Sequence, residues 1–422
     1  MRVLIVSASY APEETGIGPY SGELAAGLAG RGHTIDVLTL PPHFPAWEVA
    51  SSERVHRRRS VRLEAAVRVH RLSSYVPPRV DAWRRIRYEL AFGTAVAQAF
   101  RSLERPDVVI VVSPPLLAAP AGLYLARRWR APSIVHLHDL VPGIARQSGA
   151  VTNPVVLGLA TGVERHVYAE ADAIAVISSA FARRVAALGH GHKCVVLPNW
   201  LRAIDREPGQ RQQAIRDEFG VAAHHFAAVY SGSMGRKQGL EILLDAGANA
   251  GPCLRLIAIG AGPALQTLAD GVARGDTPML TLHPLQPRQR LPHVLASFDA
   301  ALLVQRTGVG ETALPSKLIT YMAAALPVVA SVDRHSEAGR VVATVGCGIV
   351  TAAGDSQALL EGLHQLRADP VAAAAMGARG RAYALAELGY DDSIRRWEGL
   401  LADVAVGVSR RGTVSRLDRG PQ

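Results

Sequence analysis

Short runs of Val, Ile, Leu and Ala recur along the whole chain, and longer stretches with helical periodicity separate them. Runs that are apolar at every position, and not at every second one, indicate strands that are buried on both faces. Alternation of such strands with helices predicts repeated βαβ units and parallel sheets. The expected strands are 3–7, 35–40, 67–71, 108–112, 133–137, 173–177, 195–197, 227–230, 254–259, 279–282, 300–304 and 327–330.

The strand pattern restarts after Leu197, so we expect two doubly wound α/β domains of Rossmann-like type. In an open parallel sheet, ligands bind at the carboxyl ends of the strands. Two such sheets that face each other would place the reactive site in the cleft between the domains. The expected segments are an N-terminal domain over 1–198, a linker over 199–216, a C-terminal domain over 217–390, a helix over 391–406 that packs back, and a flexible basic tail over 407–422.

Composition restricts the classes of protein to which the chain belongs. With 49% hydrophobic and 19% charged residues among 422, it can bury a large core and is not a disordered chain. Its three cysteines (Cys194, Cys253 and Cys347) are too few and too scattered for a disulfide framework, which favours a reducing cytoplasm. The uncharged stretch 108–126 contains three prolines, so we expect a strand, a loop and a helix start there and not a membrane span.

Positive charge is concentrated in particular segments of the chain. The net charge is +10, and residues 51–90 carry eleven arginines against four acidic residues, interleaved with Tyr75, Trp83 and Tyr88. Such a mixture is typical of an anionic membrane surface, a lipid-diphosphate ligand or a nucleic acid. We favour the membrane surface or lipid diphosphate over a solvated basic face, and we expect no nucleic-acid partner. The protein is expected in the cytoplasm, with peripheral attachment at the inner face of the plasma membrane as the membrane alternative.

The segment 12–22 follows the first expected strand and contains Gly16 and Gly18. Glycines allow a backbone to approach a ligand closely, and a helix that begins near Pro19 would favour an anion at its N-terminus. A dinucleotide site is disfavoured because eight residues separate Ser7 from Gly16 and because no acidic residue ends the second strand. Contact with a phosphate or a sugar is favoured over an ordinary loop.

His136 and His138 lie at the end of the expected strand 133–137 and are followed by Asp139. Strand alternation places both imidazoles on the same side of the strand. A metal site would need further ligands at defined spacing, and none is evident, so no metal site is predicted. His138 is instead expected to orient hydroxyl groups or to stabilise positive charge, with a purely structural pair of histidines as the alternative.

Two glycine-containing turns follow strands of the second half. The segment 230–241 contains Gly232, and then Arg236 and Lys237. A glycine-rich turn with two adjacent cations can hold a diphosphate through backbone amides and positive charge. The turn that contains Gly260 is a weaker signal of the same kind.

The segment 308–323 also follows a strand, and Pro315 and Ser316 suit the start of a helix. Backbone amides at that start, together with Lys317, would form a second anion pocket. Lysine is rare in this chain: Lys193, Lys237 and Lys317 are the only three, whereas arginine is common. A retained lysine indicates a need for a compact ammonium group in place of a planar guanidinium.

Six motifs occur in the order in which one known family has them, and together they are specific. They are Tyr10-Ala-Pro-Glu-Glu-Thr-Gly-Ile-Gly18, Gly30-Arg-Gly-His33, Pro41-Pro-His-Phe-Pro45, Leu197-Pro-Asn-Trp200, Ser231-Gly-Ser-Met-Gly-Arg-Lys-Gln-Gly239 and Pro315-Ser-Lys-Leu318. On these motifs the chain resembles the family 4 nucleotide-sugar glycosyltransferases of the GT-B fold, of the colanic-acid and O-antigen type. The resemblance covers about residues 1–405.

The resemblance implies a retaining, hexosyltransferase-type enzyme of surface polysaccharide biosynthesis. Its donor would be a UDP- or GDP-linked sugar, its acceptor an oligosaccharide, polysaccharide or lipid-linked saccharide, and it would need neither a metal nor another cofactor. The resemblance implies catalytic roles for His138 under the donor sugar, Lys237 at the diphosphate, and Glu311. The residues implied to bind the donor are Gly16, Gly18, Gly232, Arg236, Lys237, Gly260, Leu285, Pro315, Ser316 and Lys317.

The chain departs from the family at its pair of glutamates, which are spaced eight residues apart. Aligned on Lys317, the two positions are Thr312 and Thr320, and Glu311 is one residue out of register. The family's basic residue after the glycine of the diphosphate loop is Ser233 in this chain. Two alternatives therefore stay open: a non-hydrolysing sugar-nucleotide epimerase of the same fold, and a catalytically degenerate paralogue.

Overall fold

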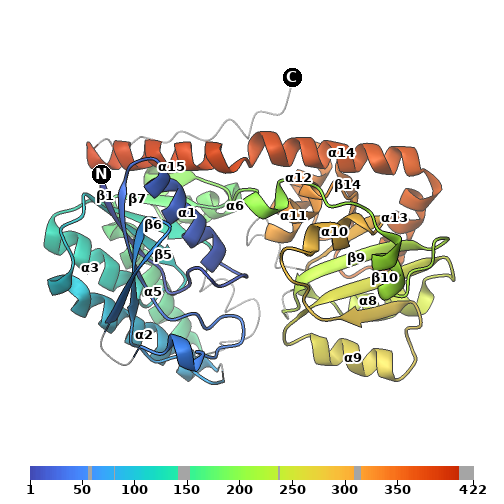
Figure 1. Cartoon of the computed structure of the whole chain (residues 1–422), viewed down its shortest axis with the longest axis horizontal. Helices are drawn as coiled ribbons and strands as arrows, with labels where there is room; N and C mark the ends of the chain where they lie inside the picture. Colours follow the sequence, from blue (N-terminus) through green and yellow to red (C-terminus); the bar gives the residue numbers. More distant parts are fainter. Residues whose placement is uncertain (56–58, 80, 141–152, 236–237, 308–314, 408–422) are drawn as a thin grey trace. The chain divides into compact units, whose positions relative to one another are not determined.

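The computed structural model describes residues 1–55, 59–79, 81–140, 153–235, 238–307 and 315–407. The chain forms two compact units (Figure 1). Unit 1 comprises Met1–Pro198 together with the segment from Asp391 onward, and unit 2 comprises Asn199–Tyr390. Each unit contains its own sheet with helices on both faces, as the alternation of apolar strands and helices predicts.

The sheet of unit 1 contains eight strands among the described residues, in the order β3-β4-β2-β1-β5-β6-β7-β8. All neighbouring strands are parallel except β3 and β4, which are antiparallel. The strands are β1 (Arg2–Val6), β2 (Thr34–Thr39), β3 (Arg59–Glu64), β4 (Val67–Leu72), β5 (Val108–Ser113), β6 (Ser133–Leu137), β7 (Ala173–Val176) and β8 (Cys194–Val196).

The helices of unit 1 cover both faces of this sheet. On one face, Gly122 of α3 lies so close to Val111 of β5 that a Cβ atom would overlap that side chain. On the opposite face, His136 of β6 contacts Trp397 of α15, with ring centroids 4.8 Å apart. The described helices of unit 1 are α1 (Gly18–Gly30), α2 (Ala82–Gln98), α3 (Ala119–Trp129), α5 (Pro154–Glu170), α6 (Ser179–Ala187) and α15 (Tyr390–Ala405).

Polar side chains fix the ends of these helices. Asp81 accepts a hydrogen bond from the amide of Arg84 at the start of α2, and Asn153 caps α5 in the same way. At the other end of α5, the Nζ atom of Lys193 donates to the carbonyl oxygens of Ala169 (2.6 Å) and Ala171 (2.8 Å). One of the three lysines thus has a structural role, because a compact ammonium can reach several carbonyl groups at once.

Unit 2 contains a six-stranded parallel sheet among the described residues, in the order β11-β10-β9-β12-β13-β14. Successive side chains of β9 belong to different buried clusters: Ala227 and Val229 to one, Ala228 and Tyr230 to the other. Its strands are β9 (Phe226–Ser233), β10 (Leu254–Ala261), β11 (Leu280–His283), β12 (Ala300–Val304), β13 (Val328–Ser331) and β14 (Gly348–Thr351). Its helices are α7 (Gln213–Glu218), α8 (Ile242–Asn249), α9 (Leu265–Ala273), α10 (Leu291–Ala296), α11 (Ser316–Ala323), α12 (Glu337–Val345), α13 (Ser356–Ala368) and α14 (Pro370–Glu387).

Each predicted strand overlaps a strand of the structure, so the predicted fold class is confirmed. Strands β3 and β14 were not predicted. In β3 the two apolar residues, Val61 and Leu63, alternate with polar ones, and this edge strand exposes much of its surface. Residues 199–216, expected as a linker, are integrated into unit 2. Arg216 is buried there and donates to the carbonyl oxygens of Ser297 (2.9 Å) and His225 (2.7 Å).

The uncharged stretch 108–126 forms β5, a turn and the first part of α3, as predicted. None of the described helices combines the length and the hydropathy that a membrane-spanning segment requires.

Trp397 provides a test of how much α15 contributes to unit 1. Its side chain is only 1% exposed, so we expect Trp397→Ala to lower the free energy of unfolding of unit 1 by about 3–5 kcal/mol. Trp83→Ala is the matched control, because Trp83 is 76% exposed and its loss is expected to cost no more than about 0.5 kcal/mol. Urea unfolding followed by circular dichroism measures both values, and equal effects would contradict the packing role of α15.

Candidate functional site

Three of the predicted site residues, Arg236, Lys237 and Glu311, lie outside the described residues. The others fall into two groups, one in each unit. Each of these residues lies at or just beyond the carboxyl end of a strand or near the start of a helix. Ligands of parallel sheets bind at this edge.

In unit 2, Gly232 and Gly260 are paired across β9 and β10. Both were predicted in turns but lie inside the strands, which run further than their apolar runs. A Cβ atom on Gly260 would overlap the carbonyl oxygen of Gly232, and one on Gly232 would lie 2.9 Å from Cε of Lys317. The φ angle of Gly232 is +125°, a conformation that side chains disfavour. These two glycines therefore allow two strand ends and a lysine side chain to meet.

Lys317 belongs to the first turn of α11. Its Nζ atom donates to the carbonyl oxygen of Ser233 at 3.2 Å and lies 5.0 Å from the ring centroid of Tyr230. Pro315 precedes the helix, and no side chain caps its start. The first amides of a helix carry partial positive charge. We call Gly232, Gly260, Ser316 and Lys317 the glycine–lysine corner, and its chemistry suits an anion.

Tyr321 fixes α11 to β9. Its hydroxyl accepts a hydrogen bond from the amide of Ser231 (2.8 Å) and donates to the carbonyl oxygen of the same residue (3.2 Å). The ring is buried, and this burial raises the pKa of Tyr321, so the hydroxyl keeps its proton. No sequence pattern indicates this contact, which holds the corner in one geometry.

Two further positions of unit 2 are ones to which the family resemblance draws attention. The hydroxyl of Thr320 donates to the carbonyl oxygen of Ser316 at 3.3 Å, so the side chain at the family's second glutamate position serves its own helix. Leu285 follows β11 and is 39% exposed. It lies at the same carboxyl edge of the sheet as the glycine–lysine corner, two strands away from β9.

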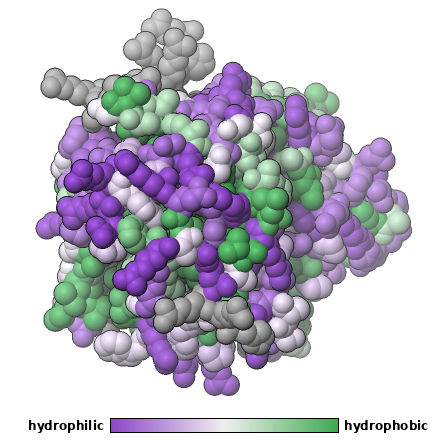
Figure 2. All heavy atoms as spheres, turned by 60° about the vertical axis from the view of Figure 1, so that its left-hand side comes forward, coloured by the Kyte–Doolittle hydropathy of each residue, from purple (hydrophilic) through white to green (hydrophobic). Residues whose placement is uncertain are grey.

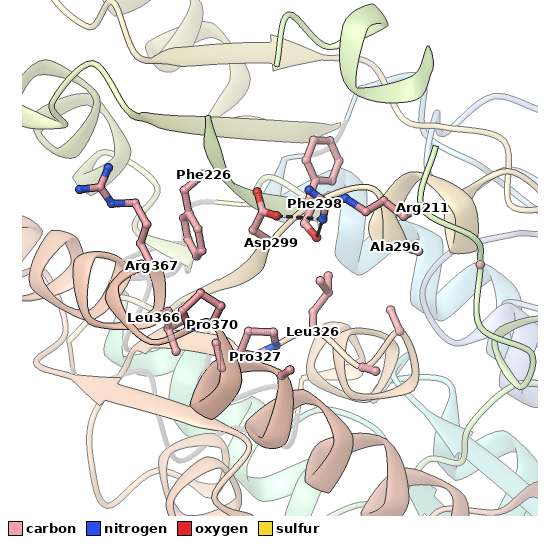
Figure 3. A pocket seen from close by; sticks show the side chains of 15 residues that line it. Arg211, Phe226, Ala296, Phe298, Asp299, Leu326, Pro327, Leu366, Arg367 and Pro370 are labelled. Atoms are coloured by element: carbon pink, nitrogen blue, oxygen red, sulfur yellow. Dashed lines mark hydrogen bonds and ion pairs between the residues drawn. The ribbon is translucent and has the colours of Figure 1, made fainter. Parts of the chain in front are cut away.

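A separate pocket of about 500 Å³ lies at the opposite edge of the unit 2 sheet (Figure 3). Phe226 begins β9 and Asp299 precedes β12, so the pocket is at the amino ends of these strands. Arg211 forms an ion pair with Asp299, with 2.8 Å between Nη1 and Oδ1. None of the predicted site residues lines this pocket.

In unit 1, His136 and His138 are in contact at the end of β6. The Nε2 atom of His138 lies 3.2 Å from Nδ1 of His136, so one ring donates to the other. Burial lowers the pKa of both imidazoles, and that of His138 falls to about 3. Both rings are neutral near pH 7. A neutral ring is compatible with both roles expected for His138, the orientation of hydroxyl groups and the stabilisation of positive charge. No cluster of metal-ligating side chains occurs among the residues described.

Gly18 begins α1, close to the predicted start at Pro19. A Cβ atom on Gly18 would lie 3.0 Å from Oε2 of Glu13. The Glu13 side chain is buried, and its Oε1 atom accepts hydrogen bonds from the amides of His43 (3.0 Å) and Phe44 (3.1 Å). A carboxylate therefore occupies the anion position at the start of α1. This gives Gly18 a packing role, whereas Gly16 is exposed beside Phe44.

His43 connects the loop after β2 with α2. Its Nδ1 atom donates to the carbonyl oxygen of Pro41 (2.9 Å), so Nε2 accepts from the hydroxyl of Tyr88 (3.0 Å). Burial lowers the pKa of His43 and raises that of Tyr88, which keeps this network neutral. The guanidinium of Arg85 lies 5.4 Å from the Tyr88 ring centroid and bonds Glu89. Sequence reasoning missed the network, although the quoted motifs contain both Glu13 and His43.

The two halves of the chain match two domain families. Residues 15–200 match the glycosyl transferase 4-like domain, and residues 225–369 match the glycosyl transferases group 1 family. Over 381 residues the chain is 29% identical to the putative colanic acid biosynthesis glycosyl transferase WcaI of Escherichia coli K12. The aligned region covers 86% of this chain and 92% of WcaI.

Solved structures with the same fold are more distant in sequence. Sucrose-phosphate synthase of Thermosynechococcus elongatus has a TM-score of 0.74 at 16% identity, with 96% of this chain and 99% of that chain covered. HepE of Anabaena, solved in complex with UDP-glucose, has a TM-score of 0.68 at 15% identity, with coverages of 96% and 100%. These similarities establish the GT-B fold.

The buried histidines predict a specific dependence of stability on pH. The pKa of His138 is about 3 in the folded chain, against 6.5 for an unperturbed imidazole. Below pH 6.5 the imidazole of His138 is therefore protonated in the unfolded chain, whereas in the folded chain it stays neutral down to about pH 3. We expect the free energy of unfolding to fall by up to about 1.4 kcal/mol per pH unit in this window because of His138.

His138→Asn removes this contribution, so its unfolding free energy should fall less steeply than that of the natural chain between pH 6 and pH 4. Urea unfolding at a series of pH values measures both slopes. For each protein, the free energy of unfolding at pH 8 is subtracted from the values at lower pH, which eliminates the packing cost of the substitution. Identical slopes would contradict a neutral, buried His138.

Proposed function

Because the chain belongs to the glycosyltransferases built from a 4-like domain and a group 1 domain, we propose that it is a retaining, hexosyltransferase-type enzyme of surface polysaccharide biosynthesis. It transfers a sugar from a UDP- or GDP-linked donor to an oligosaccharide, polysaccharide or lipid-linked saccharide. The observation that carries this proposal is the glycine–lysine corner, which combines close backbone approach, an ammonium group and an uncapped helix start. The colanic-acid role in the name of the E. coli relative and the UDP-glucose bound to HepE agree with it.

The corner binds the donor diphosphate. Lys317 and the first amides of α11 stabilise the negative charge that develops on the leaving nucleoside diphosphate. Arg236 and Lys237 follow β9 in the sequence, and we expect them to supply two further cations to the diphosphate. The base lies near Leu285, at the end of β11. Since Thr320 bonds within its helix, the ribose is held without the family's second glutamate.

Transfer breaks the bond between the anomeric carbon and the phosphate oxygen and forms a bond to an acceptor hydroxyl oxygen. The acceptor proton passes to the departing phosphate oxygen. Attack on the face that the leaving group vacates retains the configuration and needs no pair of enzyme carboxylates, unlike hydrolysis by retaining glycosidases. The neutral His138 ring provides a hydrogen bond to a hydroxyl of the donor sugar.

The acceptor binds to unit 1 near residues 41–92. This region combines the half-buried rings of Phe44 and Trp47, whose centroids are 6.3 Å apart, with a high density of arginines. Aromatic rings suit sugar faces, and guanidinium groups suit the diphosphate of a lipid carrier. We place the enzyme in the cytoplasm, at the inner face of the plasma membrane.

Replacement of Lys317 tests the donor site. We expect Lys317→Met to lower kcat about 10²- to 10³-fold, because one well-placed donor to the developing charge is lost. Lys193→Met is the matched control: it removes the contacts at the end of α5 and lowers stability by about 1–2 kcal/mol while nucleotide binding persists. Unchanged turnover in Lys317→Met would contradict the proposed role of the glycine–lysine corner in binding the donor diphosphate. Lys237→Ala is expected to lower turnover in the same way.

A panel of nucleoside diphosphates and sugar nucleotides in a thermal-shift assay tests donor binding directly. We expect UDP, GDP or their sugars to raise the melting temperature with the logarithm of concentration. The natural chain incubated with a stabilising donor should release nucleoside diphosphate only when an acceptor is present. Conversion of the donor to an isomer without acceptor would instead identify an epimerase.

Chelation of divalent ions tests the proposal that cationic side chains, and not a metal ion, stabilise the negative charge on the leaving nucleoside diphosphate. Since Lys317 and its neighbours supply positive charge at the leaving group, we expect turnover to be unchanged by EDTA. The assay compares initial rates before and after removal of divalent ions. Loss of activity that a divalent ion restores would contradict the metal-free mechanism.

A further inference from the structure

The first half of α5 is an apolar surface. The stretch Pro154–Val163 contains no charged residue, and none of its residues is buried. Its most exposed side is the stripe formed by Val155, Gly158, Leu159 and Gly162, which have the i, i+3, i+4, i+7 spacing of one helix face. Val155 is 67% exposed and Leu159 68%. A helix on a protein surface usually turns its polar side outward, so this stripe requires an explanation.

Neighbouring helices continue this surface. Helix α3 packs against both α5 and α2 in one layer, and Tyr124 of α3 is 50% exposed. On α2, Trp83 is 76% exposed and Leu90 52%. We call the exposed side chains Trp83, Leu90, Tyr124, Val155 and Leu159 the α2–α3–α5 face. Figure 2 shows apolar groups between long hydrophilic side chains on the side of the molecule where unit 1 comes forward.

The position of this face within unit 1 follows from the βαβ connections. Each of the three helices leads into the next parallel strand, so it runs antiparallel to the strands, and its first turn lies near their carboxyl ends. Trp83 and Val155 are second residues of their helices. The apolar face therefore begins at the edge of the unit 1 sheet where His138 and Glu13 lie.

Arginines accompany the apolar groups. Arg84 and Arg87 share the exposed side of α2 with Trp83 and Leu90. The guanidinium of Arg87 lies 4.2 Å from the ring centroid of Tyr75. At the other end of the layer, α3 ends with Arg127 and Arg128, which are also exposed. Positive charge of this kind is complementary to anionic lipid headgroups.

We infer that the α2–α3–α5 face docks onto an anionic lipid bilayer. The stripe of α5 offers no hydrogen-bonding side chain, so its partner needs only hydrocarbon. Trp83 and Tyr124 suit the interface between headgroups and acyl chains, and Arg84 and Arg87 suit the headgroups. The inference rests on the proposed function, because docking of this face would bring the acceptor-binding edge of unit 1 to a lipid-linked saccharide in the membrane. A second copy of the chain is disfavoured as occupant because a symmetric contact would oppose arginine-bearing surfaces.

Vesicle flotation of the full chain tests the inference. We expect the chain to float at low salt with vesicles of equal parts phosphatidylcholine and phosphatidylglycerol, and far less with phosphatidylcholine alone. The double variant Val155→Asp/Leu159→Asp should bind the mixed vesicles at least ~10-fold more weakly, which corresponds to about 1.4 kcal/mol. Arg84→Glu/Arg87→Glu should lose the preference for phosphatidylglycerol. Val371→Asp is the matched control, since Val371 is an 80% exposed valine of unit 2.

Failure of this inference can be told apart from failure of the proposed function. Circular dichroism verifies that each variant is folded, and the nucleotide thermal shift should be the same in all of them. Absence of flotation by the natural chain, or flotation of the aspartate variant equal to that of the natural chain, would overturn the inference while nucleotide binding stands. A concentration-dependent dimer that the aspartate substitutions abolish, without flotation, would overturn it in favour of a second copy.

Discussion

Burial of both faces of each parallel sheet is the constraint on which the rest of this structure depends. Helices cover the strands on both sides, so polar groups can reach a ligand only beyond the strand ends. The polar groups of interest accordingly lie there: His136 and His138 at the end of β6, and the carbonyl group of Ser233 at the end of β9. The same burial keeps the two imidazoles neutral, so the fold determines which chemistry a histidine at that position can perform.

Close approach of backbones at glycine residues is a second constraint on both units. In unit 2, the absence of side chains at Gly232 and Gly260 lets two strand ends meet the ammonium group of Lys317. In unit 1, the absence of a side chain at Gly18 makes room for the carboxylate of Glu13. Two glycine-containing segments that look alike in sequence thus differ in electrostatics, because one borders a cation and the other a carboxylate. The difference favours unit 2 as the place for a diphosphate.

The sequence predicts most strands of both sheets because burial on both faces leaves a continuous apolar run. It does not predict β3, whose two apolar residues alternate with polar ones at a sheet edge. The glycines and Lys317 of the glycine–lysine corner are visible as motifs. The bonds of Glu13 with His43, and of His43 with Tyr88, join separate loops and helices, and no local pattern encodes them. The α5 stripe was also missed, because an apolar helix face has the same periodicity whether protein covers it or not.

The return of α15 to unit 1 has a consequence for biosynthesis. Trp397 covers His136, yet 192 residues of unit 2 separate Pro198 from Asp391. At about 5–20 residues per second, roughly ten to forty seconds of translation elapse before the ribosome supplies this covering helix. During that interval the nascent unit 1 has an open apolar surface, while unit 2 is uninterrupted in sequence and can complete its own core. The part that is synthesised first is therefore the part that finishes last.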